Sequence, residues 1–136
     1  MGTTQESSDA TAKLKVTVLR VRQPLASLVP GLPERKSYEY AAVEVRTCVV
    51  ENTSGQEISL SWGPWSLAFP DGTIIEAMSA WSSEWWDVSL YPNSDRSVRT
   101  GRCVKGWIPF EVPKGSKPKY VNYDPQSTSS LEWVIR

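Results

Sequence analysis

The sequence contains no histidine and only two cysteines among its 136 residues. Histidine is the usual general base beside a catalytic nucleophile and the commonest metal ligand. Its absence argues against an enzyme with a histidine-activated nucleophile and against a zinc site. Neither Cys48 nor Cys103 belongs to a CxxC pair, which removes the usual cysteine-only metal motif. We therefore expect no metal, no cofactor and no catalytic residues.

Net charge and long apolar runs are also missing. Fifteen Lys and Arg residues balance fifteen Asp and Glu residues, which removes the positive surface that most nucleic-acid binders and polybasic membrane-surface proteins carry. No apolar run approaches the roughly 18 residues of a membrane span. We expect no nucleic-acid partner, and membrane attachment only through a lipid anchor that would precede this chain.

The N-terminal stretch MGTTQESSDATAK is polar and resembles a tether that follows a removed segment. We therefore assign residues 1–13 to a disordered N-terminal tether. Residues 14–136 are predicted to form one domain, because a chain of this size is close to the commonest length for a single core.

Short runs of Val, Thr and aromatic residues between turn residues predict an all-β fold. Leu14, Val16 and Val18 alternate with polar residues, as in a half-buried strand. Residues 38–52 form the longest predicted strand, and a Pro-Asp-Gly turn at 70–72 predicts a hairpin. About seven short antiparallel strands in this order are typical of an immunoglobulin-like β-sandwich.

The stretch from 76 to 88, EAMSAWSSEWWDV, departs from the strand pattern. Its residues Met78, Trp81, Trp85 and Val88 recur at helical spacing. We therefore expect a short helical turn or a packed loop in this stretch, and at most one short helical segment in the whole fold.

The two cysteines lie off the predicted core face of their strands. Alternation places Cys48 in the phase of Arg46 and Cys103 in the phase of Lys105. Two cysteines with the same facing suit a bond between neighbouring strands, whose paired α-carbons sit about 4.5 to 5.5 Å apart. We predict a Cys48–Cys103 disulfide. Two unpaired structural thiols are the alternative, although free thiols on a wet face are unusual.

Seven tryptophans are too many for one small core, because each buries about 150 to 250 Å². Trp65 and Trp133 fall in the core phase and are assigned to packing. Trp81, Trp85 and Trp86 are the candidate ligand-binding residues, as an exposed aromatic platform that stacks on sugars or anchors a protein partner. The alternative is that these three side chains fold back as a cluster that caps an open edge of the sandwich.

Several motifs resemble one family. A strand that ends in an Asn-Thr turn at Asn52 and Thr53, followed by GRCVKGWIPFEVP at 101–113, is similar to the telokin-like domain of exported actinobacterial lipoproteins and secreted proteins. The family of the secreted mycobacterial immunoprotective antigen shares this immunoglobulin-like fold class. The resemblance covers nearly everything after residue 13. It implies export, a β-sandwich and, in the two-cysteine branch, a disulfide, but it implies no catalytic residues and no known function.

Two functions are compatible with these features. We expect a non-catalytic binding or interaction module, extracellular or on the outer face of the membrane in the bacterial cell envelope, with an unknown protein or cell-wall glycan as partner. The alternative is a cell-wall carbohydrate-binding module that uses residues 81–86. A monomer or weak dimer is expected. Enzyme activity is not expected, because the carboxylates are scattered and no pair is placed for acid–base chemistry.

Overall fold

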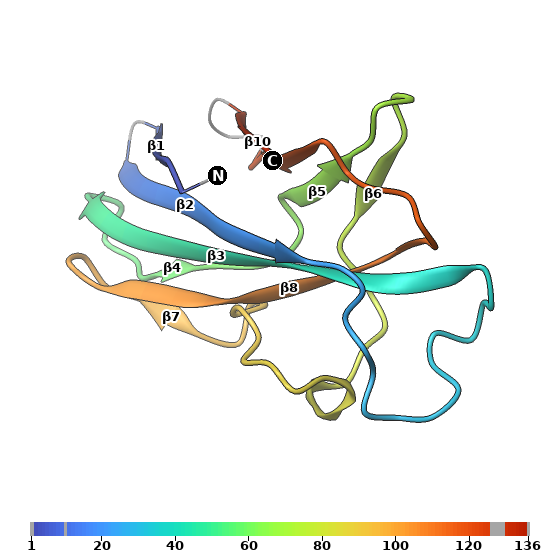
Figure 1. The fold of residues 1–136 in the computed structure, drawn as a ribbon. Helices are drawn as coiled ribbons and strands as arrows, with labels where there is room; N and C mark the ends of the chain where they lie inside the picture. The colour runs from blue at the N-terminus through green and yellow to red at the C-terminus, as the bar shows by residue number, and fades with distance from the viewer. Residues whose placement is uncertain (1, 10, 126–129, 136) are drawn as a thin grey trace.

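The structure is a computed structural model that describes residues 2–9, 11–125 and 130–135. Two four-stranded antiparallel sheets, in the orders β1-β2-β3-β8 and β10-β9-β5-β6, form the two layers, and β4 pairs with β7 beside them (Figure 1). The strands are β1 (Thr4–Ser8), β2 (Ala12–Arg22), β3 (Tyr38–Asn52), β4 (Ile58–Ser59), β5 (Trp65–Ala68), β6 (Ile74–Glu76), β7 (Ser97–Val98), β8 (Cys103–Pro113), β9 (Tyr120–Tyr123) and β10 (Leu131–Val134).

The predicted all-β immunoglobulin-like sandwich is confirmed. β3 has the bounds that the alternation predicted, and β5 and β6 form the predicted hairpin. The described residues contain ten strands rather than about seven. The additional strands were missed because β4 and β7 have only two residues each, too few for an alternating pattern to be recognised.

The predicted disorder of residues 1–13 is wrong, because Thr4–Ser8 forms β1 and pairs with β2 along its whole length. Ser7 faces inward and is buried. The Trp133 indole also donates a hydrogen bond to the Thr3 carbonyl oxygen at 2.8 Å. The polar composition concealed this strand because an edge strand is held by backbone pairing and does not require apolar side chains.

The main core lies between the two sheets. Leu14, Val16 and Val18 of β2 point into it, as their alternation predicted. Trp65 and Trp133 are also confirmed as core residues, since both are buried and their rings stack at 5.8 Å. Local alternation therefore identified the residues that hold the sheets together.

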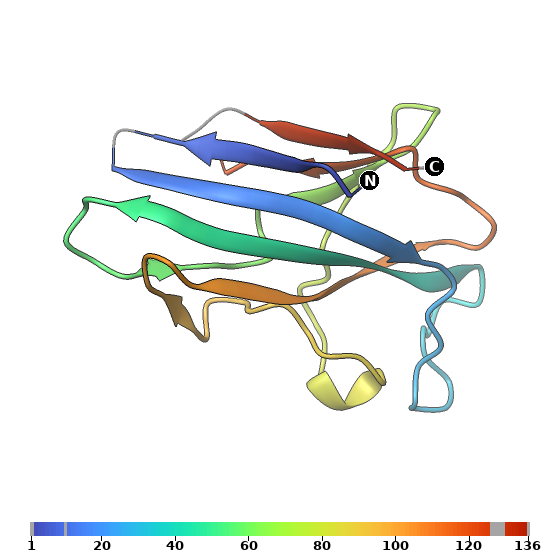
Figure 2. The same cartoon turned by 60° about the vertical axis from the view of Figure 1, so that its left-hand side comes forward.

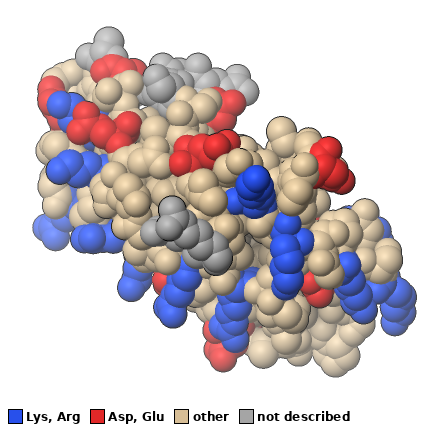
Figure 3. Space-filling view, turned by 45° about the horizontal axis from the view of Figure 1, so that its top comes forward, with Lys and Arg blue, Asp and Glu red and all other residues tan. Residues whose placement is uncertain are grey.

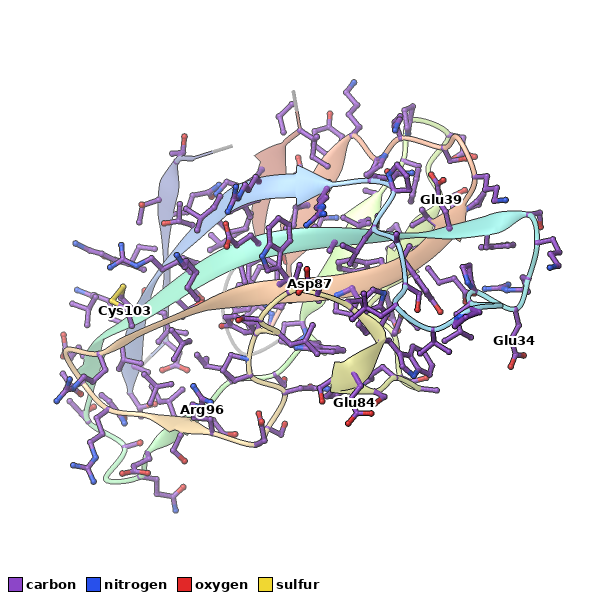
Figure 4. All side chains as sticks on the ribbon, turned by 60° about the horizontal axis from the view of Figure 1, so that its bottom comes forward. Glu34, Glu39, Glu84, Asp87, Arg96 and Cys103 are labelled. Atoms are coloured by element: carbon purple, nitrogen blue, oxygen red, sulfur yellow. A yellow bond between two sulfur atoms is a disulfide. The ribbon has the colours of Figure 1, made fainter. Side chains whose placement is uncertain are left out.

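The outer face of the β1-β2-β3-β8 sheet is buried as well at one end. Residues 40–45 of β3 are all buried, whereas a sheet with one wet face alternates. Residues 23–37 and 77–91 cross over this face, and we call them the covering segments. Both project from the same side of the sheet (Figure 2). The rest of the outer face, around the disulfide, is uncovered, and we call it the bare half (Figure 4).

The helical prediction is confirmed. One 3-10 turn, η1 (Ser83–Trp85), lies within the second covering segment, and no other helix occurs among the described residues. The helical spacing extended further than the helix, because Met78 and Trp81 lie outside it.

The predicted disulfide is present. Cys48 and Cys103 are directly paired across β3 and β8, and a disulfide joins their sulfur atoms. Cys103 is exposed on the outer face of the sheet (Figure 4), as the alternation required.

A buried hydroxyl pair lies inside the main core. The Tyr91 hydroxyl and Thr47 Oγ1 are 2.7 Å apart. Burial raises the pKa of Tyr91, and the hydrogen bond with Thr47 offsets this only in part. The folded protein therefore keeps the proton on Tyr91 at a pH where the unfolded chain, with a tyrosine pKa of about 10, has lost it.

The contribution of Tyr91 to stability should consequently be constant below about pH 10 and fall as the pH rises further, because the unfolded state then binds fewer protons than the folded state. In Tyr91→Phe the loss of stability above pH 10 should be smaller, since the hydroxyl with the most strongly raised pKa is removed. Urea unfolding followed by tryptophan fluorescence between pH 8 and 11 measures it. Equal pH dependence in the two proteins would contradict the assignment to Tyr91.

Candidate functional site

The candidate site is the point where the covering segments meet, and we call it the two-loop tip: Leu28 and Val29 from the first segment and Trp85 from the second. The Trp85 carbonyl oxygen accepts hydrogen bonds from the Leu28 amide at 2.6 Å and from the Ser27 hydroxyl at 3.1 Å. Leu28 is nevertheless 61% exposed and Val29 39% exposed, and Trp85 is half-buried. The tip is therefore an apolar surface on a hydrogen-bonded backbone.

The sequence of the first covering segment explains its shape. Its three prolines lack the amide hydrogen that a sheet ladder requires, so the chain leaves the sheet after Arg22. The Ser27 hydroxyl accepts from the Val29 amide at 3.1 Å, which forms a tight local turn. Gly31 then has a φ of 84°, a value that favours glycine. These features direct Leu28 and Val29 outward.

The second covering segment presents Trp85 through η1. The Ser82 hydroxyl accepts from the Glu84 amide at 3.3 Å, and the Ser82 carbonyl oxygen accepts from the Trp85 amide at 3.1 Å. The Trp85 ring packs on Trp86 at 5.5 Å in an edge arrangement. Glu84 remains at the surface on this turn (Figure 4).

A second apolar cluster supports the tip from beneath, on the outer face of the sheet. Its buried members are Leu25, Tyr40, Ala42, Trp86 and Trp107. The Trp86 ring meets the Tyr40 ring edge to face at 5.2 Å, and the Leu25 amide donates to the Tyr40 carbonyl oxygen at 2.8 Å. Burial raises the pKa of Tyr40. The tip therefore rests on packed side chains.

The second covering segment is also tied to β8 by its backbone. The Tyr91 amide donates to the Trp107 carbonyl oxygen, and the Trp107 amide donates to the Ser89 carbonyl oxygen, each at 2.9 Å. This approach is possible because Gly106 has no side chain, since a Cβ there would lie 2.6 Å from the Leu90 carbonyl carbon. Gly106 therefore fixes the segment that carries Trp85.

The predicted platform of Trp81, Trp85 and Trp86 is wrong in one member. Trp86 is only 3% exposed and belongs to the second cluster. Trp81 is 36% exposed but lies against Trp62 at 4.6 Å, away from the Trp85–Trp86 contact. Trp86 instead follows the alternative in which these side chains fold back, although it covers the outer face of the sheet rather than an open edge.

The covering segments carry three exposed carboxylates and one exposed cation without an ion pair, Lys36, among the described residues. Glu34, Glu84 and Asp87 are exposed, and no ion pair within 4.0 Å involves them among the described residues (Figure 4). The nearby cation Arg35 is neutralised by Glu111, whose carboxylate lies 2.8 Å from its guanidinium. The apolar tip thus has an acidic margin.

Sequence reasoning missed Leu28 and Val29. The sequence did contain a signal for them, namely two large apolar residues inside a loop with three prolines. Such residues either pack under the loop or remain exposed. Leu25 packs under the loop, and Leu28 remains exposed. Only the hydrogen bonds to Trp85 decide between these outcomes.

The described part of the chain has neither a metal-binding cluster nor a helix that could span a membrane. No group of three or more acidic, histidine or cysteine side chains there is placed to hold a metal ion. None of the helical residues in that part forms a stretch long and apolar enough to cross a bilayer.

Comparison with known proteins gives two matches. The family described as "Domain of unknown function (DUF4352)" matches residues 5–132. A secreted protein from Mycobacterium tuberculosis, MPT63, has a similar crystal structure with a TM-score of 0.71 and 16% identity, covering 98% of this chain and 92% of that chain. At this identity the similarity shows the shared fold. No curated protein matches.

Proposed function

Because the chain belongs to the DUF4352 family of domains of unknown function, we propose its function from its own surface: it is an exported, non-catalytic interaction module whose protein partner docks on the two-loop tip. The observation that carries this proposal is the 61% exposure of Leu28 on a backbone held by Trp85. A large apolar side chain in that position gains free energy when a partner covers it.

Export is supported by two observations. The Cys48–Cys103 disulfide favours an oxidising environment, because persistent disulfides are rare in the reducing cytosol. The solved structure with the same fold belongs to a secreted protein. The placement outside the cell, or on the outer face of the membrane in the cell envelope, is part of the proposal.

Docking at the tip is supported by the restrained backbone of the tip and by its apolar side chains. Leu28, Val29 and Trp85 need little further ordering on binding, since hydrogen bonds and the Trp86 contact already restrain them. Complete burial of a side chain such as leucine contributes about 1.5 to 3 kcal/mol. The acidic margin favours a partner with an apolar pocket surrounded by cations.

The carbohydrate alternative has less support. Stacking on a sugar requires an open aromatic face, and the burial of Trp86 removes one of the three candidate rings. Trp81 is 36% exposed, but it packs on Trp62 and makes no ring contact with Trp85 or Trp86 among the described residues, so no platform of three rings forms. Trp85 is the one of these three rings that belongs to the two-loop tip, and it is half-buried.

The double variant Leu28→Ser/Val29→Ser tests the proposal. Partners are captured from envelope extract with the wild-type protein, and the affinity of the captured protein is then measured for each variant. We expect about 30-fold weaker binding, corresponding to a loss of about 2 kcal/mol of buried apolar contact. Stability should be unchanged, because both side chains are exposed.

Ile74→Ser is the matched control, since Ile74 is 62% exposed on β6, outside the covering segments. It should bind as the wild type does. Equal affinity of the tip variant and the wild type would contradict the proposed surface. Retention of a cell-wall glycan that is lost in Trp85→Ala would favour the carbohydrate alternative instead.

A further inference from the structure

The bare half of the outer face carries three cations around the disulfide. One row across the sheet runs from Glu6 of β1 to Lys15, then to Cys48 and Cys103, each opposite the next. In the next row Arg46 is opposite Lys105. All three cationic side chains are exposed, on the face that the core residues of these strands leave free.

In the described part of the chain, none of these cations has a carboxylate at ion-pair distance, although Glu6 of β1 lies opposite Lys15 in the register. Among the described residues no Asp or Glu oxygen lies within 4.0 Å of Lys15, Arg46 or Lys105. The Arg46 guanidinium instead donates to Cys103 Sγ at 3.6 Å. In the view of Figure 3, which is turned toward the other side of the molecule from Figure 4, Lys and Arg are most numerous along the lower side and several Asp and Glu lie between them.

The borders of this surface are different, because their cations are already neutralised. Arg20 lies 2.8 Å from the buried carboxylate of Glu44 and over the Trp107 ring. At the other border Lys13 lies 4.0 Å from Glu6. We use the name cationic row for Lys15, Arg46 and Lys105, which follow one another across β2, β3 and β8 and make no ion pair within 4.0 Å among the described residues.

The cationic row costs stability. Arg46 and Lys105 occupy directly opposite positions on one face, and like charges in such positions repel. A carboxylate at either position would remove the repulsion. The arrangement is therefore unfavourable in the isolated protein, and a bound anion would relieve it.

We propose that the bare half binds a linear phosphodiester polymer that crosses β2, β3 and β8. Neighbouring strands are about 4.8 Å apart, so a chain crossing them meets successive cations. The two free oxygens of a phosphodiester match the guanidinium fork of Arg46, while Lys15 and Lys105 act as point charges on either side. This site is separate from the two-loop tip.

A membrane surface fits the same charges less well. The covering segments form a packed layer over the neighbouring half of this sheet face (Figure 4). A flat bilayer resting on that layer would be held off the bare half by about 10 Å, the usual spacing of packed layers. That exceeds the Debye length of about 8 Å at physiological salt, so the attraction would be largely screened. A narrow chain has no such obstacle.

The test uses a glycerol-phosphate polymer as the probe, with binding followed by calorimetry at several salt concentrations. Three phosphate contacts should give a slope of log K against log salt of about −2, from about −0.7 for each contact along a single strand. The variant Lys15→Gln/Arg46→Gln/Lys105→Gln should lose at least 30-fold in affinity, or about 2 kcal/mol. Its melting temperature should be equal to or above that of the wild type.

The matched control is Lys36→Gln/Lys114→Gln/Lys117→Gln, which removes the same charge beyond the opposite end of β3 and β8. It should bind as the wild type does. Equal weakening in both variants would overturn the proposal in favour of net charge alone.

Other ligands define the remaining outcomes. Equal affinity for polygalacturonate, for phosphatidylglycerol vesicles or for duplex DNA would overturn the assignment to a phosphodiester polymer. The tip variant Leu28→Ser/Val29→Ser should bind the polymer normally, since its exposed side chains lie on a covering segment. A result that contradicts one of the two proposed sites therefore does not contradict the other.

Discussion

Replacement of both Cys48 and Cys103 by alanine is expected to lower the free energy of unfolding by roughly 4 kcal/mol and the melting temperature by about 15 °C. The disulfide joins residues 55 positions apart, and opening so long a loop increases the conformational entropy of the unfolded chain. Differential scanning calorimetry measures both quantities.

The fold and the surface should survive this change. The sulfur atoms lie on the outer face, so the core contacts of Val45 and Ile108 remain. Wild-type protein with a strong reductant should show the same shift, which separates the loss of the bond from the effect of the substitutions. A melting temperature that stays at the wild-type value in both experiments would contradict a stabilising role.

Gly106→Ala is expected to cost about 3 kcal/mol or more, at the upper end of what overpacking usually causes. The added Cβ would lie 2.6 Å from the Leu90 carbonyl carbon and would meet the backbone of Tyr91. Backbone atoms cannot rotate away as a flexible side chain can, so the second covering segment must move off β8. Urea denaturation gives the change in stability, and a red shift of the total tryptophan emission relative to the wild type reports exposure of the buried Trp86.

Gly63→Ala is the control for the loss of glycine itself. A Cβ at Gly63 would be 3.8 Å from Ser61 Oγ, an ordinary contact. Its stability should be close to that of the wild type. If Gly106→Ala is as stable as Gly63→Ala, the covering segment does not depend on the close approach at Gly106.

Local alternation predicted the elements in which one face is buried and the other is wet. β2 and β3 were found in this way, and the facing of Cys48 and Cys103 followed from the same period of two. β1 was not found, because its pairing with β2 is a backbone property that polar side chains do not reveal. The pattern thus reports side-chain burial rather than strand pairing.

The candidate site could be predicted only in part. The sequence indicated that residues 76–88 were unusual and rich in tryptophan, but the burial of Trp86 depends on Tyr40, which is distant in the chain. A clue was present in the adjacent Ala41 and Ala42, since two small apolar residues in succession indicate a strand covered on both faces. Exposure of Leu28 depends on a hydrogen bond to Trp85 that no local pattern specifies.

Site-specific photocrosslinking tests most directly whether the two-loop tip is the docking surface. A benzophenone amino acid replaces Leu28 in one protein and Ile74 in another, two positions of similar exposure. Irradiation in envelope extract should give a discrete adduct with one protein from position 28 and none from position 74. Unlabelled wild-type protein should compete for that adduct, whereas Leu28→Ser/Val29→Ser should not. Equal adducts from both positions, or competition by the tip variant, would contradict docking at the tip.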